Sequence, residues 1–199
     1  MSTHNRVIDA AKYRFSEKDR LCLDTNVWLC LFPFSTQKDR KISDYTSTVR
    51  KIVQSKATIV TDILILSEYM NRYANFAWRA YENDPKTKEH FDSYKRFRKS
   101  GHFAPIAERV SHNASRIVAF CRQHIHLPIA EKEVDLVHIL EDCGKAKCDF
   151  GDAVIADKCR IFNCKLVTDD YDFGQVSYGI DVITHNSKML RDFSSSVEV

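Results

Sequence analysis

The hydrophobic pattern of the chain alternates between short apolar runs and longer stretches with helical spacing. Short apolar runs that are closed by polar residues are typical of buried strands, and the run at 57–61 is also rich in β-branched side chains. The apolar runs lie at 20–26, 57–61, 165–168 and 180–184. Between them, apolar residues recur with the period of a helix over 39–55, 64–73, 134–140 and 150–162. Strands that alternate with helices predict an α/β fold, in which a mainly parallel central sheet is covered by helices on both faces.

Other segments give weaker signals. Asp62 directly precedes a helical stretch and is expected to cap it. The residues 27–34 continue the first apolar run and are expected to form a helical turn. The middle of the chain, 81–126, is expected to be helical throughout, with breaks only at Asp84-Pro85 and Gly101.

The domain organisation follows from length and from this pattern. A chain of 199 residues fits one domain. We expect its core to span about 20–185, with an inserted helical hairpin at about 80–126 and a short extended piece at 126–129.

Composition narrows the classes of protein further. The net charge of +3 and the pI of about 8.4 are compatible with a nucleic-acid partner. The seven Cys form no C-x-x-C pair and the polar N-terminal segment lacks a signal-peptide core, so we expect a reduced, cytoplasmic protein. No apolar stretch approaches the length of a membrane span, so no membrane partner is expected. The motifs G-x-S-x-G, G-x-x-x-x-G-K and H-E-x-x-H are absent from the sequence.

Carboxylates stand beside otherwise apolar elements in four places. Asp24 ends the first strand, and Asp169, Asp170 and Asp172 follow a late one; Glu68 lies in the helix after the second strand, and Asp149 and Asp152 flank the start of a late helix. Carboxyl ends of parallel strands meet at one edge of a sheet, where ligands bind. Several carboxylates gathered there would repel one another, and a divalent cation removes that cost. Such an ion can also activate water against a phosphodiester without any Ser, Cys or His nucleophile.

Four blocks of sequence resemble the motifs of PIN domains. They are Leu23-Asp24-Thr25-Asn26-Val27-Trp28, Ser67-Glu68, Gly151-Asp152-Ala153-Val154-Ile155-Ala156 and the block 166–173, which runs Leu-Val-Thr-Asp-Asp-Tyr-Asp-Phe. They occur in the family's order across about 21–184, and the VapC-type toxins of bacterial toxin–antitoxin pairs look closest. The segment between Glu68 and Asp152 is longer than is usual for those toxins.

The resemblance implies a three-layer α/β/α fold and a Mg²⁺- or Mn²⁺-dependent endoribonuclease, a hydrolase of RNA phosphodiester bonds. It places Asp24, Glu68, Asp152 and Asp170 around the metal. Asp24 and Asp152 are the main ligands in this interpretation, and Glu68 and Asp170 bind a second ion or orient the attacking water. Asp172 is the alternative to Asp170, and Asp149 is a further candidate ligand. Thr25, Asn26 and Thr168 are expected to orient the acids.

Each acid also has a purely structural interpretation. Asp24 could cap a turn, Glu68 could complement a helix dipole, and Asp169 is expected to face solvent. Asp149 and Asp152 have the spacing of a capping box, so Asp149 is equally a helix cap or a site residue.

The segment 71–99 interleaves basic and aromatic residues. It could be a surface for single-stranded RNA, a groove for an antitoxin helix, or an amphipathic helical pair whose aromatic residues pack inward. The last interpretation is favoured, because aromatic residues at helical spacing usually pack inward.

The biological role has several versions. The resemblance favours a toxin with a small antitoxin partner, and by resemblance a homodimer is expected. A housekeeping nuclease in RNA maturation or decay, and a non-catalytic binding module with the same fold, are the alternatives. A phosphatase or a DNA-acting nuclease could use the same acids, because two-metal chemistry does not distinguish esters.

Overall fold

The central feature of the computed structural model is a parallel sheet. The structure describes residues 4–34, 39–121, 123–124, 135–145 and 148–193. Within them six strands pair in the order β1-β6-β5-β2-β3-β4, and every pairing is parallel. The strands are β1 (Arg6–Asp9), β2 (Arg20–Leu23), β3 (Thr58–Thr61), β4 (Gln123–His124), β5 (Lys165–Val167) and β6 (Asp181–Thr184). The α/β prediction with a mainly parallel sheet is confirmed.

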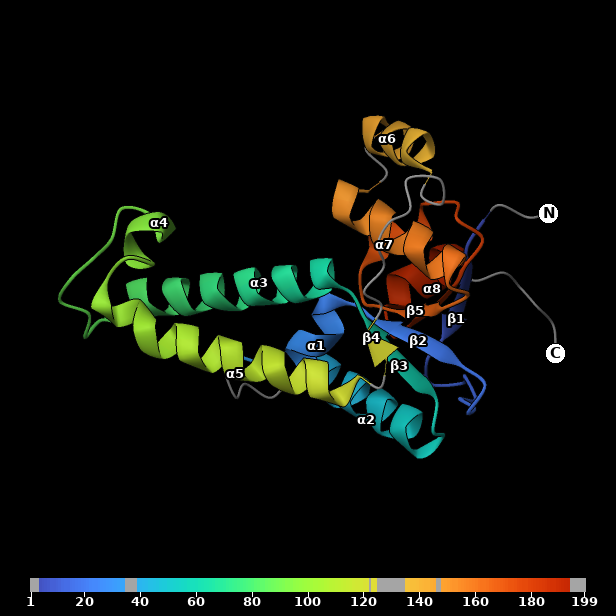
Figure 1. The fold of residues 1–199 in the computed structure, drawn as a ribbon, viewed down its shortest axis with the longest axis horizontal. Helices are drawn as coiled ribbons and strands as arrows, with labels where there is room; N and C mark the ends of the chain where they lie inside the picture. The colour runs from blue at the N-terminus through green and yellow to red at the C-terminus, as the bar shows by residue number, and fades with distance from the viewer. Residues whose placement is uncertain (1–3, 35–38, 122, 125–134, 146–147, 194–199) are drawn as a thin grey trace.

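Helices cover the sheet on both sides (Figure 1). They are α1 (Thr25–Leu31), α2 (Arg40–Gln54), α3 (Ile63–Glu82), α4 (Tyr94–Phe97), α5 (Ala104–Phe120), α6 (Leu136–Gly144), α7 (Phe150–Ile161) and α8 (Ser187–Phe193), with 3₁₀ turns η1 (Gly101–Phe103) and η2 (Tyr171–Gly174). The connection from β2 to β3 contains α1 and α2, and α7 precedes β5. Connections between parallel strands are right-handed, and these two run in opposite directions across the sheet, so they place α1 and α2 on one face and α7 on the other. Within the described residues, no helix has the length and apolarity needed to cross a membrane.

Aspartate caps set where several helices begin. Asp39, Asp62 and Asp149 each stand in extended backbone and accept a hydrogen bond from a backbone N–H of the helix that follows. The cap predicted at Asp62 is therefore present. The predicted strand at 20–26 ends at Leu23, because Asp24 already caps α1. The helical turn expected at 27–34 begins earlier, at Thr25.

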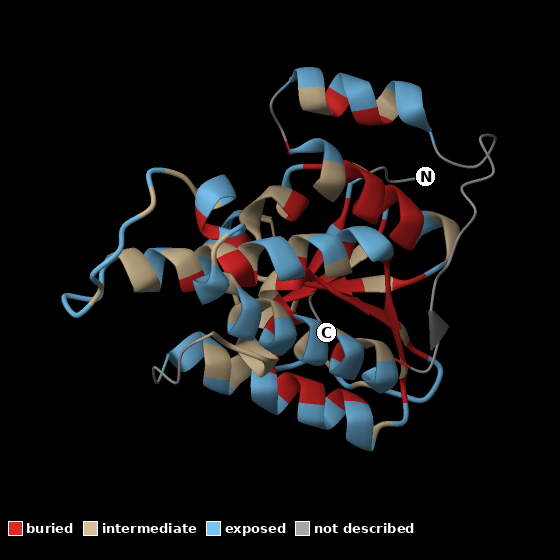
Figure 2. Cartoon of the chain, turned by 60° about the vertical axis from the view of Figure 1, so that its left-hand side comes forward, coloured by how far each residue is buried: buried red, intermediate tan, exposed pale blue. Residues whose placement is uncertain are grey.

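The core lies between the sheet and its helices, where Figure 2 shows the strands buried. Trp28 of α1, Tyr45 of α2 and Phe173 of η2 have no exposed surface, like Leu21 and Leu23 of β2. Cys22, whose side chain points to the opposite face of the strand from Leu21 and Leu23, is only 4% exposed, so β2 is covered on both faces.

The inserted helical region forms an arm that extends away from the sheet (Figure 1). In the arm α3 packs along α5, and α4 lies near the far end. The prediction that 81–126 is helical throughout is wrong, since 83–93 contains no helix and Gln123–His124 is a strand. At the break, the Asp84 side chain accepts a hydrogen bond from the Lys86 N–H at 2.9 Å, an Asx turn that Pro85 favours.

Two elements lie outside the predictions. β1 has a single fully buried position, Val7, and exists through its pairing with β6. α8 lies beyond the last predicted strand and packs against β1. The extended piece expected at 126–129, and Val134, lie outside the described residues.

Candidate active site

The candidate site lies at the carboxyl ends of β2 and β5, two neighbouring strands after which the chain continues to opposite sides of the sheet. β2 leads through α1 and α2 to β3 on one side, whereas β5 leads to β6 on the other. Because β2 and β5 pair directly, their carboxyl ends form the topological switch point at which α/β sheets bind ligands. The chain after β2 begins with Asp24, and the chain after β5 begins with Thr168.

Asp24 is the most enclosed acid of this site. Its residue is only 4% exposed. Its carboxylate accepts hydrogen bonds from the Thr25 backbone N–H at 2.6 Å, from Asn26 Nδ2 at 2.6 Å and from Thr168 Oγ1 at 2.7 Å. The side chain therefore caps α1 and is held by β5 at the same time. Three donors fix its orientation before any ligand binds.

Thr168 connects Asp24 to the acidic loop after β5. Its hydroxyl donates to Asp24 Oδ2 and accepts the Asp170 N–H at 2.9 Å. Asn26 Oδ1 accepts the Asp169 N–H at 3.0 Å, and the Asn26 amide also lies 3.1 Å from Thr168 Oγ1. The loop that carries Asp170 is thus positioned by the residues next to Asp24.

Glu68 approaches the same place from α3. Its Oε2 accepts a hydrogen bond from Thr25 Oγ1 at 2.8 Å, and its Oε1 pairs with Arg72 Nη1 at 3.1 Å. No acid occupies the first turn of α3, so Glu68 lies beyond the positions where a helix dipole acts most strongly. The dipole interpretation of Glu68 is therefore disfavoured, and its contact with Thr25 links it to Asp24.

Asp152 comes from the first turn of α7. Asp149 caps this helix and accepts the Asp152 N–H at 2.9 Å, as the capping-box spacing predicts. Asp149 therefore has a structural role. The Asp152 carboxylate accepts no hydrogen bond from the residues that the structure describes, so it is available to a ligand of the site.

The acids from these four segments interact electrostatically. Burial raises the pKa of Asp24 to about 7, against the opposing effect of its hydrogen bonds, and the charges of Glu68 and Asp170 raise it further. Burial also raises the pKa of Asp152 to about 8, with added repulsion from Asp149, Asp24, Asp170 and Glu68. These carboxylates lie close enough to destabilise one another's charged forms. The arrangement favours a cation.

The donor atoms of the site suit a hard divalent cation that keeps some of its waters, and not a metal ion held entirely by protein ligands. All the candidate ligands are carboxylate oxygens, which hard cations prefer. In the described residues no three His, Cys, Asp or Glu side chains are arranged to hold a metal ion by themselves. Mg²⁺ does not require that, since it usually keeps several waters and binds through one or two carboxylates together with substrate phosphate.

The three aspartates that follow β5, Asp169, Asp170 and Asp172, have different surroundings. Asp170 repels both Asp24 and Asp152, whereas the Asp172 carboxylate accepts a hydrogen bond from Gln175 Nε2 at 2.9 Å on the surface. The Asp170 side chain also caps η2, because its Oδ1 accepts the Asp172 N–H at 3.1 Å. The electrostatic interaction of Asp170 with Asp24 and Asp152 nevertheless favours it over Asp172 as a site residue. Asp169 was expected to face solvent, and that is wrong: its side chain is 15% exposed and pairs with Lys41 Nζ at 2.6 Å.

Two supporting contacts were not predicted. The Tyr45 hydroxyl lies 2.9 Å from the Thr168 carbonyl and accepts the His185 N–H at 3.1 Å, which ties α2 to the loops after β5 and β6. The sequence predicted only the helical stretch 39–55 that contains Tyr45, because a hydrophobic pattern does not show where a hydroxyl points. Asp62 and Lys158 form a buried ion pair of 2.6 Å between the helices that carry Glu68 and Asp152.

These pKa shifts predict that the metal-free protein loses stability as pH rises. With ordinary carboxyl values of 3.8, Asp24 and Asp152 bind more protons in the folded than in the unfolded state up to about pH 7 and 8. Stability therefore falls with pH across this window. We expect the melting temperature in EDTA to decrease from pH 5 to pH 8, and Mg²⁺ to raise it most at the alkaline end. The same decrease in Asp24→Asn/Asp152→Asn would contradict this origin.

Comparison with known proteins identifies a family. A family model described as the PIN domain matches residues 21–179. No curated protein sequence matches the chain. Among solved structures, VapBC2 from Rickettsia felis bound to a DNA fragment from its promoter is similar at a TM-score of 0.44 and 15% identity, over 82% of this chain and 98% of that chain. The family match spans most of the chain and includes all four candidate acids, so this protein belongs to the PIN domain family.

Proposed function

We propose that this protein is a Mg²⁺- or Mn²⁺-dependent endoribonuclease and acts as the toxin of a toxin–antitoxin pair. Membership of the PIN domain family supports a nuclease that uses a divalent metal. The observation that carries the proposal is the hydrogen-bond network of Thr25, Asn26 and Thr168, which holds Asp24, Glu68 and the Asp170 loop at one edge of the sheet. Burial and repulsion from these acids raise the pKa of Asp152, which comes from a fourth segment. A fold gains nothing from assembling such acids at one sheet edge unless a cation offsets their charge.

Each residue of the site has a distinct task in this proposal. Asp24 and Asp152 would hold the cation, with Glu68 and Asp170 beside them. Thr25, Asn26 and Thr168 orient Asp24, Glu68 and the Asp170 loop through their hydrogen bonds. Arg72, half-exposed and paired with Glu68, is placed to contact a phosphate once substrate arrives.

The bound metal would supply Lewis-acid polarisation of the phosphodiester and activation of water. The protein positions the acids in advance, so little reorganisation is needed when substrate binds. Oxygen ligands at an edge of the sheet also leave room for a phosphate, which a closed cage of ligands would exclude.

A small antitoxin is the proposed protein partner, as in VapC-type pairs. An exposed apolar surface on α6 and the start of α7 supports a protein partner: Leu136 is 49%, Val137 71%, Leu140 61% and Phe150 51% exposed. Apolar residues grouped in this way commonly mark an interaction site. The homodimer, the cytoplasmic location and the domain boundaries stay predictions.

Metal-dependent cleavage of RNA tests the enzymatic proposal. We expect the purified protein to cut a single-stranded RNA with Mg²⁺ or Mn²⁺ and to leave it intact in EDTA, because the acids repel phosphate unless a cation is present. Gel analysis of a labelled RNA measures this, with DNA of the same sequence as the specificity control.

Calorimetric titration with Mn²⁺ separates failure of chemistry from failure of binding. Metal binding without cleavage of any RNA would support the non-catalytic binding module instead. Equal cleavage of RNA and DNA would contradict the ribonuclease assignment, and unchanged cleavage in EDTA would contradict the metal.

A further inference from the structure

The far end of the arm forms a small aromatic core of its own. We call residues 79–103, between α3 and α5, the arm tip. Phe97 is fully buried there, with its ring centroid 5.0 Å from Tyr81, 5.5 Å from Phe91 and 5.9 Å from Phe103. The interpretation that aromatic residues of 71–99 pack inward therefore holds for these side chains, and the arm tip is held by its own packing.

The surface of the arm tip is basic. It contains seven Lys or Arg and four Asp or Glu residues, a net charge of +3, which equals the net charge of the whole chain. The remainder of the protein is therefore neutral overall. A concentration of all the excess positive charge on one projecting element is the pattern expected of a polyanion-binding surface.

The acids of the arm tip are already engaged, whereas most of its cations are not. Asp92 pairs with Arg96 at 2.9 Å, and Glu82 and Glu89 accept contacts from His90 and His102 at 2.9 and 3.1 Å. The Asp84 side chain caps a turn. Among the described residues, no ion-pair partner faces the following exposed side chains: Arg79, Lys86, Lys88, Lys95 and Lys99. These five cations remain available to an external anion.

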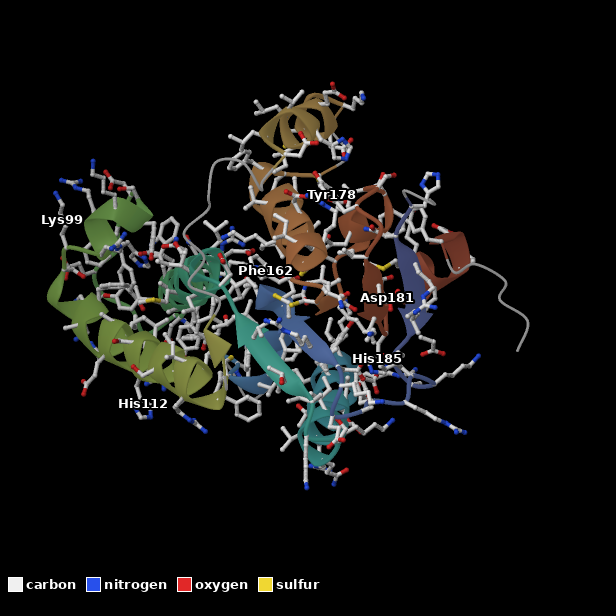
Figure 3. The ribbon with its side chains drawn as sticks, turned by 45° about the vertical axis from the view of Figure 1, so that its right-hand side comes forward. Lys99, His112, Phe162, Tyr178, Asp181 and His185 are labelled. Atoms are coloured by element: carbon white, nitrogen blue, oxygen red, sulfur yellow. The ribbon has the colours of Figure 1, made fainter. Side chains whose placement is uncertain are left out.

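A hollow of about 560 Å³ opens on the arm tip, and it is lined by Glu89, His90, Phe91, Asp92, Arg96, Lys99 and Ser100. Its two acids are already engaged, Asp92 with Arg96 and Glu89 with His102, so Lys99 is the lining cation without an ion-pair partner among the described residues. Phe91 is half-buried, so it belongs to the aromatic core and also lines the hollow. Figure 3 shows Lys99 at the outer end of the arm, pointing away from the body of the protein. An aromatic surface beside cations fits an unstacked base and its phosphate, the combination by which proteins hold single-stranded nucleic acid.

The helix α3 connects this surface to the candidate acids. Glu68 belongs to its second turn and Glu82 ends it, which separates the two by about 21 Å along the helix axis. Half-exposed Arg72 and Asn75 lie between them, together with Phe76, which is 40% exposed. A strand that is cut at the acids would have to extend along the arm to reach the tip.

We propose that the arm tip binds single-stranded RNA at a distance from the cleavage site. This inference rests on the proposed ribonuclease function and names where that substrate gains affinity. The arm tip increases the binding of long RNA and does not act on the bond that is cut, so it affects KM and not kcat.

The test removes the charge of the arm tip without touching the acids. The variant Lys86→Gln/Lys88→Gln/Lys95→Gln/Lys99→Gln replaces four exposed lysines. We expect its Kd for a fluorescent RNA of about 20 nucleotides to rise at least tenfold, and the salt slope to become less negative by roughly 0.7 for each phosphate that the variant no longer neutralises. Fluorescence anisotropy at several salt concentrations measures both. Cleavage of an RNA of about 4 nucleotides, too short to span the arm, should keep its kcat and KM.

A matched control carries the same change of net charge elsewhere. Lys12→Gln/Lys18→Gln/Lys51→Gln/Lys145→Gln also replaces four exposed lysines, all outside the arm tip. Equal RNA affinity in the two variants would overturn the proposal, because total charge would then explain the binding. Unchanged RNA affinity in the arm-tip variant, together with weaker binding of a protein partner, would overturn it in favour of an acidic protein ligand. Anisotropy needs no catalysis, so RNA binding by the arm is tested even if no cleavage is found.

Discussion

We expect Asp24→Asn to lower metal-dependent RNA cleavage about a thousandfold or more, because loss of a main metal ligand removes several kcal/mol of transition-state stabilisation. The amide has the shape of the carboxylate but no charge, and it cannot accept all three hydrogen bonds that Thr25, Asn26 and Thr168 donate. Single-turnover cleavage of a labelled RNA at saturating Mn²⁺ measures the loss.

The same substitution should not unfold the protein. Burial and the charges of Glu68 and Asp170 oppose ionisation of Asp24, so a neutral side chain relieves this repulsion in the metal-free state. We expect the melting temperature of Asp24→Asn in EDTA at pH 8 to equal or exceed that of the wild type. A melting temperature that falls to the assay temperature would assign the lost activity to unfolding.

Neighbouring acids provide the controls for Asp24→Asn. Asp172→Asn should retain cleavage, since this carboxylate contacts Gln175 on the surface, whereas Asp170→Asn should lose it. Loss of activity in Asp172→Asn and not in Asp170→Asn would reverse their assignment.

Induced expression of the wild type should arrest growth, and Asp24→Asn should relieve the arrest. A wild type that cleaves RNA and leaves growth unaffected would favour the maturation nuclease over the toxin.

We expect Lys158→Met to lower the free energy of unfolding by about 3–5 kcal/mol. Lys158 and Asp62 are 8% and 7% exposed at the side chain, and the substitution leaves a buried carboxylate without its cation. That decrease is a large share of a typical domain's stability of about 5–15 kcal/mol. Denaturant unfolding followed by circular dichroism measures it.

Replacement of both partners identifies the cause. Asp62→Leu/Lys158→Met removes the pair together and should recover most of the lost stability, because two apolar side chains need no desolvation of charge. Part of the α3 cap would still be lost, since the Asp62 side chain also accepts the Leu64 N–H at 2.8 Å. Lys145→Met breaks an exposed pair with Glu141 and should cost less than about 1 kcal/mol. A double variant no more stable than Lys158→Met would show that packing, and not the ion pair, is the source.

Much of the fold has local signals in the sequence. The buried strands β2, β3, β5 and β6 lie in short apolar runs, because a strand covered on both faces needs apolar side chains at consecutive positions, and β3 and β6 are also rich in β-branched residues. Asp62 and Asp149 mark helix starts, because a side-chain oxygen at that position binds the free N–H groups of the first turn. The sequence blocks that resemble the family motifs identify the candidate acids Asp24, Glu68, Asp152 and Asp170.

Tertiary structure decided the rest. Asp24 and Thr168 are brought together only by the pairing of β2 with β5, and β1 forms because β6 offers it a partner. Asp169, in the loop after β5, is covered because Lys41 of α2 reaches it, and the Asp62–Lys158 pair joins helices that are distant in sequence. Periodicity reports which face of an element is apolar, whereas contacts between distant segments depend on how those faces pack. The sequence thus determined most of the buried elements and the candidate acids, and packing decided which charges meet and which edge segments pair.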